Sequence, residues 1–341
     1  MADRLRVGVI GLRMGRSHVA GYAGHPSSDV IALCDTDAAR LRQVANEFGV
    51  KATYADYRSM LDAEKLDVVS VATPNVWHKA MTIDALAAGC HVLCEKPMAM
   101  NAAEGEEMLA ASRRHGRRLM IHFNRRFAPI SHAARQLIAS GRLGEVYFVR
   151  TIWHRRSGVP WWYGNFTPAS NGGGPLVDLG VHMLDLGMWL AGYPDPTCVL
   201  AATWNPIAPG QAEARGLPFT VEDFGAAMIR LANGAMVELE ASWASHRGQK
   251  DDVHTRVHGT KGGLMIGSRG NQVFLELDGA PVDVQWNETG VPPCPGPCHA
   301  FADAILNDLP TPVTAEQGLT VTRILDAVYE SARTGHPVSL P

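Results

Sequence analysis

The stretch Leu5-Arg6-Val7-Gly8-Val9-Ile10-Gly11-Leu12-Arg13-Met14-Gly15 decides the fold class of this chain. Its apolar residues over 5–10 predict a short strand, and Gly11 predicts a tight turn into a helix over about 15–23. A second apolar run, Val30–Cys34, ends on Asp35. A strand, a glycine turn and a helix, with an acidic residue about 20 residues further on, are typical of a dinucleotide-binding βαβ unit.

The alternation of strands and helices continues to about residue 124. Further strands are predicted at Val68–Ala72, Cys90–Cys94 and Leu119–Phe123, and helices at Ala38–Phe48, His78–Ala88 and Asn101–His115. Strands of about five residues between helices of about ten indicate a doubly wound parallel sheet. We therefore expect residues 1–124 to form a dinucleotide-binding domain.

The pattern changes over residues 125–341, for which we expect a second α/β domain that binds substrate and forms oligomers. Its strands are predicted at Glu145–His154, Val199–Trp204, Gly225–Leu231, Ala235–Trp243, Val253–His258, Gly263–Ile266, Val273–Leu277 and Val282–Trp286. Helices are predicted at Pro129–Ser140, Val177–Leu190, His299–Asn307 and Ala315–Thr334, and loops at Ala208–Gln211 and Val291–Pro297. For the last two helices, packing back on the first domain is an alternative. Asn233-Gly234 between two strands is a strong hairpin signal. The prediction is a large, mostly antiparallel, open sheet.

The composition restricts the class of protein. The chain has 341 residues, 46% of them hydrophobic and 19% charged, and a net charge of -3. These values are ordinary for a soluble globular protein and argue against a nucleic-acid or membrane-surface partner. No apolar run reaches the roughly 18 residues of a membrane helix. Six scattered cysteines and an N-terminus that leads straight into a strand favour a reducing, cytoplasmic location.

The glycine turn is the candidate nucleotide site. Gly11, Leu12, Arg13 and Met14 lead into a helix N-terminus, where backbone amides bind phosphate. An ordinary glycine turn is the alternative, because Arg13 stands where a second glycine is usual. Asp35 can accept hydrogen bonds from ribose hydroxyls, or it can simply cap a turn. Its charge favours NAD, while Arg13 and Arg40 leave NADP possible.

Glu95-Lys96-Pro97 follows the predicted strand Cys90–Cys94. The carboxyl edge of an open α/β sheet is where ligands bind. A lysine there can hydrogen-bond a substrate hydroxyl and stabilise a developing alkoxide, although a surface lysine is the simpler interpretation. The Lys96–Pro97 bond is a candidate cis peptide.

Asp178, His182 and Asp185 follow three glycines, at a spacing that places them on one helical face. Three interpretations of His182 remain open: a general acid–base, a metal ligand with Asp178, or a buried structural histidine. The metal interpretation lacks a clear third and fourth ligand, so no metal is expected.

Several motifs together resemble the Gfo/Idh/MocA family, which includes glucose–fructose oxidoreductase and inositol 2-dehydrogenase. They are Ala72-Thr73-Pro74-Asn75 with His78, Ala88 to Ala99 around Glu95-Lys96-Pro97, Asn124-Arg125-Arg126-Phe127, Gly141-Arg142-Leu143-Gly144, and Gly173 to Asp185. The resemblance implies a Rossmann domain, a C-terminal α/β domain whose sheet mediates homodimers or homotetramers, and the catalytic set Lys96, Asp178 and His182. Arg13 departs from the family pattern.

The hypothesis is therefore an NAD(P)-dependent dehydrogenase that oxidises a hydroxyl of a sugar or cyclitol lying between the two domains. Further candidate cofactor residues are Thr73, Pro74, Asn75, His78, Glu95, Lys96, Arg125 and Trp162, and the candidate substrate residues are Lys96, Arg125, His154, Tyr163, Asp178 and His182. For Trp162 a core position beside Trp161 is the alternative. An NAD-dependent glycosidase that forms a transient keto sugar, and a non-catalytic NAD(P)-binding regulator, are the alternative functions.

Overall fold

The computed structural model describes residues 4–287, 291 and 294–340, and these form two compact units. The first unit comprises the residues up to Phe123 together with Pro295–Thr322. The second comprises Asn124–Cys294 and the residues from Arg323 onward. Helix α11 (Ala315–Thr334) contributes residues to both units.

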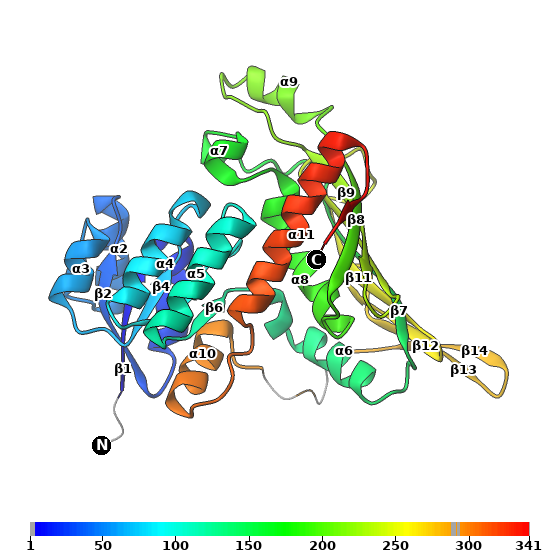
Figure 1. Cartoon of the computed structure of the whole chain (residues 1–341), viewed down its shortest axis with the longest axis horizontal. Coiled ribbons are helices and arrows are strands. Elements are labelled where there is room, and N and C mark those ends of the chain that lie inside the picture. Colours follow the sequence, from blue (N-terminus) through cyan, green and yellow to red (C-terminus); the bar gives the residue numbers. More distant parts are fainter. Residues whose placement is uncertain (1–3, 288–290, 292–293, 341) are drawn as a thin grey trace. The chain divides into compact units, whose positions relative to one another are not determined.

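Within the described residues, a six-stranded sheet in the order β3-β2-β1-β4-β5-β6 forms the centre of the first unit (Figure 1). Its strands are β1 (Leu5–Ile10), β2 (Ser28–Cys34), β3 (Ala52–Tyr54), β4 (Val68–Val71), β5 (His91–Cys94) and β6 (Leu119–Ile121). Neighbouring strands are parallel. The strand order reverses between β1 and β4, so the predicted doubly wound sheet is confirmed, and its switch point lies where ligands bind in such sheets.

Helices α1 (Leu12–Ala23), α2 (Ala38–Phe48), α3 (Tyr57–Ala63), α4 (His78–Ala87) and α5 (Ala102–His115) connect these strands, with a 3-10 turn η1 at Asn75–Trp77 before α4. Helix α10 (Pro297–Leu306) belongs to the same unit. Local chemistry sets several ends: the Asp37 side chain accepts the amides of Ala39 and Arg40 to begin α2. Gly49 ends that helix with a φ of 70°, a conformation that glycine adopts without strain.

The sequence pattern does not predict β3 or α3. Strand β3 has three residues at the edge of the sheet, and helix α3 has seven. Such short elements do not complete enough periods to show an apolar face. Tyr57 and Met60 are the buried residues of α3, so packing against the sheet rather than local propensity accounts for it.

In the second unit the described residues form a nine-stranded sheet in the order β14-β13-β12-β11-β7-β10-β9-β8-β15. The strands are β7 (Val146–Arg155), β8 (Pro196–Trp204), β9 (Phe224–Leu231), β10 (Met236–Ser242), β11 (Asp251–Gly259), β12 (Gly262–Gly267), β13 (Gln272–Leu277), β14 (Ala280–Gln285) and β15 (Val338–Ser339). Strands β7 and β10 pair in parallel and the other pairs are antiparallel. The predicted open, mostly antiparallel sheet is therefore confirmed, with β9 and β10 as the hairpin.

Helix α8 (Val181–Leu190) lies against one face of this sheet. A Cβ at Gly187 would come within 2.9 Å of the Thr151 side chain and 3.2 Å of Val237, so glycine allows the close approach. The unit's other helices are α6 (Pro129–Ala139), α7 (Pro168–Asn171), α9 (Ala208–Glu213), the 3-10 turns η2 (Asn124–Phe127) and η3 (Trp161–Tyr163), and the π-helical turn η4 (Leu176–Gly180).

Two expectations for this unit need correction. The predicted loop Ala208–Gln211 is the start of helix α9, because Asp223 Oδ2 accepts the amides of Ile207 and Ala208 at 2.8 and 2.7 Å and so caps it from a distant position. The first turn of the predicted helix Val177–Leu190 is π-helical rather than α-helical. The predicted loop Val291–Pro297 lies partly outside the described residues, and Pro297 begins α10.

None of the helices in the described ranges combines the length and apolar character that crossing a membrane requires. The six cysteines all lie within the described residues, and none of them forms a disulfide bond.

Candidate functional site

The turn after β1 is shaped by two glycines. Gly11 has a φ of 83°, and a Cβ there would lie 2.5 Å from the Ala72 carbonyl oxygen. A Cβ at Gly15 would lie 2.9 Å from Val9, so this glycine brings α1 close to the sheet. Arg13 and Met14 are exposed on the first turn of α1, and the missing glycine at position 13 therefore leaves the turn intact. Amides at such a helix start are suited to a pyrophosphate.

Asp35 follows β2 and is 7% exposed. Its carboxylate accepts the Leu12 amide at 2.7 Å, the Asp37 amide at 2.8 Å, and two hydrogen bonds from the Arg40 guanidinium at 2.8 and 3.0 Å. Burial raises the pKa of Asp35, but Arg40 and the two amides outweigh it and lower the pKa. Asp37 rather than Asp35 caps α2. Asp35 thus fixes the glycine turn, and Arg40 offsets part of its charge.

Thr73, Pro74 and Asn75 follow β4 and lead into η1. Pro74 is exposed, whereas Thr73 and Asn75 are half-buried. His78, predicted to contact the cofactor, is fully buried, and its two ring nitrogens lie 2.8 Å from the Pro97 carbonyl oxygen and 2.9 Å from that of Thr73. The residue therefore links two loops at the carboxyl edge of the sheet.

Lys96 follows β5 and is half-buried. The predicted cis bond between Lys96 and Pro97 is present. The Lys96 amide donates to Glu95 Oε2 at 3.0 Å. Sequence reasoning suggested Glu95 as a cofactor residue. Glu95 is only 6% exposed, and its carboxylate holds the main chain of Lys96.

Two histidines that sequence reasoning missed contact the other oxygen of Glu95. His18 Nε2 and His122 Nδ1 lie 3.0 and 3.1 Å from Glu95 Oε1. Burial raises the pKa of Glu95, but the two histidines outweigh it and hold the pKa well below its usual range. A signal existed for His18, because it lies on the buried face of α1 with Gly15, Val19 and Tyr22.

His18, His122 and Cys298 place three potential metal-ligating atoms within 4.8 Å of one another. The two imidazole rings stack, with centroids 4.3 Å apart and planes at 30°. Ring nitrogens bind metals along the ring plane, and stacked rings do not direct both nitrogens to one point. His18 Nδ1 also pairs with Ser70 Oγ at 2.6 Å. The arrangement fits a hydrogen-bonded network that supports Glu95.

In the second unit, buried polar contacts hold the start of the helix that carries Asp178 and His182. Glu222 accepts the Gly174 amide at 3.0 Å, the Leu176 amide at 3.1 Å and the Tyr329 hydroxyl at 2.9 Å. A Cβ at Gly174 would lie 2.1 Å from the Glu222 carbonyl oxygen, and one at Gly173 would lie 2.0 Å from the Tyr329 hydroxyl. The glycines are therefore needed for this close packing.

The π-helical turn η4 contains Asp178, which is half-buried. The Trp243 indole Nε1–H donates to Asp178 Oδ2 at 3.0 Å, and Trp243 is itself buried. This contact orients one carboxylate oxygen. Single π-turns within α-helices are frequent at functional sites.

His182 lies in the next turn, is 8% exposed, and packs beside the Trp153 ring with centroids 5.9 Å apart. The Arg125 guanidinium lies over the same ring, 4.3 Å from its centroid. Burial lowers the pKa of Arg125. The second unit thus gathers Arg125 and His182 around Trp153. Sequence reasoning did not identify Trp153 as a site residue.

Asp185 has a structural role. It is fully buried, accepts a hydrogen bond from Arg126 Nε at 2.8 Å and lies 3.3 Å from the Tyr193 hydroxyl. Burial raises the pKa of Asp185 against the opposing effect of Arg126. Asp185 was expected on the same helical face as Asp178 and His182, but its buried partners give it a structural role outside the candidate site.

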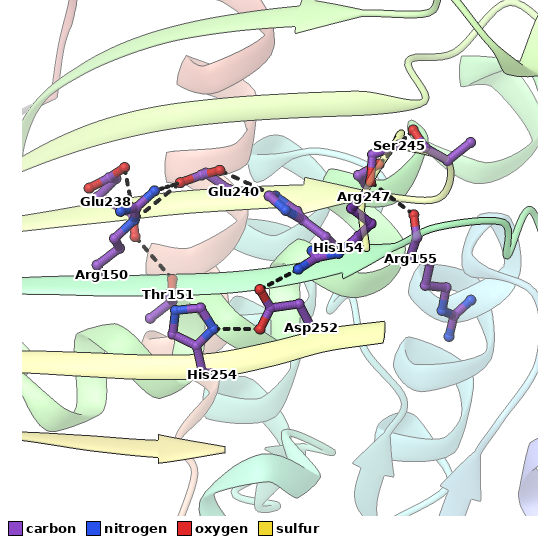
Figure 2. A network of polar contacts seen from close by, with 12 residues as sticks. Arg150, Thr151, His154, Arg155, Glu238, Glu240, Ser245, Arg247, Asp252 and His254 are labelled. Atoms are coloured by element: carbon purple, nitrogen blue, oxygen red, sulfur yellow. Dashed lines mark hydrogen bonds and ion pairs between the residues drawn. The ribbon is translucent and has the colours of Figure 1, made fainter. Parts of the chain in front are cut away.

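His154 is not brought together with His182. It follows Trp153 on β7, and side chains alternate between the faces of a strand. His154 Nε2 lies 3.3 Å from Glu240 Oε2, in a charged network on the face away from α8 (Figure 2). His154 and Arg150 lower the pKa of Glu240 to about 2. Asp252 on β11 is the cross-strand neighbour of His154, and it accepts from Arg269 Nε at 3.0 Å.

Trp162 and Tyr163 lie on η3 and are 60% and 45% exposed. The core position considered for Trp162 is therefore wrong, whereas the neighbouring Trp161 packs its ring on Phe166, with centroids 5.5 Å apart. Phe166 is fully buried and lies edge-on to Trp243, which bonds Asp178. An aromatic cluster thus connects the η3 loop with Asp178.

Known proteins share this architecture along its whole length. The chain is 32% identical to the D-glucoside 3-dehydrogenase of Escherichia coli over 345 residues, which is 98% of this chain and 97% of that protein. It is 30% identical to the levoglucosan dehydrogenase of Pseudarthrobacter phenanthrenivorans over 293 residues, 77% of this chain and 74% of that protein. A crystal structure of levoglucosan dehydrogenase in complex with NADH and levoglucosan matches with a TM-score of 0.88 and 27% identity, over 99% of this chain and 100% of that chain.

Family models agree with both halves of the chain. Residues 5–123 match the model described as "Oxidoreductase family, NAD-binding Rossmann fold". Residues 135–340 match "Oxidoreductase family, C-terminal alpha/beta domain". With the doubly wound sheet and its glycine turn, these matches show that the chain belongs to the Gfo/Idh/MocA family of oxidoreductases and has NAD as its cofactor.

Proposed function

We propose that this oxidoreductase is a dehydrogenase that oxidises a secondary hydroxyl group of a sugar, a sugar derivative or a cyclitol, with Lys96, Asp178 and His182 as its catalytic residues. The observation that carries the proposal is the helix start in the second unit, where Trp243 orients Asp178 and His182 follows in the next turn. A relative named D-glucoside 3-dehydrogenase makes glucosides the first substrates to test.

The proposed chemistry divides among the three side chains. NAD, when bound, supplies the hydride acceptor. His182 takes the proton of the substrate hydroxyl as the hydride leaves the same carbon, so that the alcohol becomes a ketone. Lys96 donates a hydrogen bond to that oxygen and stabilises its developing negative charge. Asp178 accepts from a neighbouring hydroxyl and orients the sugar.

Other residues receive binding roles in this proposal. The amides after Gly11 and the exposed Arg13 would bind the pyrophosphate, and Asp35 would accept from the adenosine ribose. Asp35 supports a preference for NAD over NADP, because its carboxylate would repel a 2′-phosphate. Arg125 and the exposed Trp162 and Tyr163 would form walls for the nicotinamide or the sugar.

We further propose that the chain forms a homodimer or homotetramer through the open face of its large sheet. On this face Leu200 and Trp204 of β8 are 48% and 50% exposed. The ion pairs of Arg150 with Glu238 and Glu240 lie across the same face (Figure 2). A sheet face with exposed apolar side chains beside ordered charges is suited to pairing with a copy of itself.

The test of the proposed reaction is NADH formation, followed by absorbance, with methyl glucosides, glucose, levoglucosan and myo-inositol. We expect turnover with at least one of these and loss of turnover in the Lys96→Ala and His182→Asn variants. A His182→Asn variant with full activity would refute the assigned roles. Release of free sugar without net NADH would favour the glycosidase, and NAD binding without turnover would favour the regulator.

A further inference from the structure

His78 bridges two segments at the carboxyl edge of the first unit's sheet. It is the first residue of α4 and is fully buried. Its Nδ1 lies 2.8 Å from the carbonyl oxygen of Pro97, and its Nε2 lies 2.9 Å from that of Thr73. Thr73 follows β4 closely and Pro97 follows β5, so one ring connects the loops that leave two neighbouring strands.

The two carbonyl partners of the ring are hydrogen-bond acceptors, and they favour its protonated form. A backbone carbonyl oxygen cannot donate, so each nitrogen of His78 must carry a hydrogen to make its bond. A neutral imidazole has one N–H and one lone pair, and that lone pair would face a carbonyl oxygen inside the protein. The imidazolium satisfies both carbonyl groups, and hydrogen bonds from a charged donor are stronger than neutral ones.

The charges around the ring act in both directions. Burial lowers the pKa of His78, but the charge and hydrogen bonding of the Cys94 side chain at the end of β5, together with the hydrogen bonds to the two carbonyl groups, outweigh it and raise the pKa to about 9. The positive end of the α4 dipole also opposes a cation at this position. Lys79, the next residue of α4, pairs with Glu104 and Glu107 of α5, at 3.9 and 3.4 Å.

We propose that His78 is a positioning residue that stays an imidazolium at neutral pH and fixes the main chain beside Lys96 by holding the Thr73 and Pro97 carbonyl groups together. Glu95 holds the Lys96 amide at 3.0 Å, so the lysine's main chain is restrained on both sides. The consequence for catalysis rests on the proposed dehydrogenase function. The charge state of His78 does not.

His91 provides a matched control at the opposite end of β5. Its Nδ1 accepts the Arg118 amide at 2.9 Å, so that nitrogen carries no hydrogen. Burial and the neighbouring Arg117 and Arg118 lower the pKa of His91 to about 4. The two histidines lie near one strand, and the structure assigns them opposite charge states at pH 7.5.

The first test is NMR of the whole protein labelled with ¹⁵N in its histidine rings, at pH 7.5 and without substrate. The signals of the two residues are assigned from the His78→Gln and His91→Gln variants. We expect two protonated ring nitrogens for His78 and one for His91. A deprotonated ring nitrogen on His78 at pH 7.5 would overturn the proposal. One metal ion per protein, bound to a His78 ring nitrogen in place of its hydrogen, would also overturn it. This readout is independent of any turnover.

The second test measures steady-state kinetics of the His78→Gln and His91→Gln variants with the best sugar substrate. Glutamine is uncharged and cannot donate in line to both carbonyl groups. We expect His78→Gln to lower kcat by roughly tenfold to a hundredfold, as displacement of a catalytic group does, with NAD affinity changed less than about threefold. His91→Gln should keep wild-type kcat. Equal losses in both variants, or an unchanged kcat in His78→Gln, would contradict the positioning role.

Discussion

Replacing Glu222 by alanine should loosen the start of the helix that carries Asp178 and His182. Glu222 is 7% exposed and accepts three hydrogen bonds, from the Gly174 amide, the Leu176 amide and the Tyr329 hydroxyl. The alanine variant leaves these three donors without their acceptor in a buried site.

The magnitude follows from the three lost acceptor contacts. A buried donor left without a partner costs about 1–3 kcal/mol. Water can enter the space that the carboxylate vacates and satisfy part of this loss. We therefore expect the free energy of unfolding to fall by about 3–5 kcal/mol, near the upper end of single-substitution effects.

Two measurements separate this effect from a general loss of structure. Urea unfolding gives the change in stability, and amide hydrogen exchange locates it, with faster exchange expected at Gly174 and Leu176. The control is Glu213→Ala, because Glu213 is exposed at the end of α9. A loss below about 1 kcal/mol, with unchanged exchange of the two amides, would refute the role assigned to Glu222.

Three further predictions concern Trp243, His78 and the open face of the large sheet. Trp243→Phe removes the donor to Asp178 while keeping an aromatic ring, so kcat should fall by roughly tenfold; unchanged kinetics would show that Asp178 needs no such partner. The raised pKa of His78, about 9, predicts that its stabilisation is complete below the unfolded pKa of about 6.5 and is lost as the pH rises through about 9. The difference in urea stability between wild type and His78→Gln should therefore shrink over this range, and a constant difference would contradict it. Leu200→Asp combined with Trp204→Asp should reduce the mass measured by light scattering to that of a monomer if the open sheet face forms the oligomer.

Local signals in the sequence were sufficient for much of the fold. The apolar run of β1 and the glycine at position 11 predicted the first βαβ unit, because strand propensity and turn conformation are properties of neighbouring residues. Asn233-Gly234 predicted the hairpin of β9 and β10 for the same reason. The motif around Glu95-Lys96-Pro97 indicated the family, and the cis bond before Pro97 was also predicted.

Only the tertiary structure decided which partners the buried polar residues have. Glu222 lies 48 positions from Gly174 and 107 from Tyr329, and no local pattern connects them. The same holds for His18, which reaches Glu95 across 77 positions. His154 shows most clearly what the sequence could not predict. The alternation of a strand predicts two faces, but which face is covered depends on what packs against the sheet. The sequence by itself therefore determined the longer elements and the family. Long-range packing decided which polar groups hold the candidate catalytic residues in place, since buried donors and acceptors take partners from wherever the fold brings them.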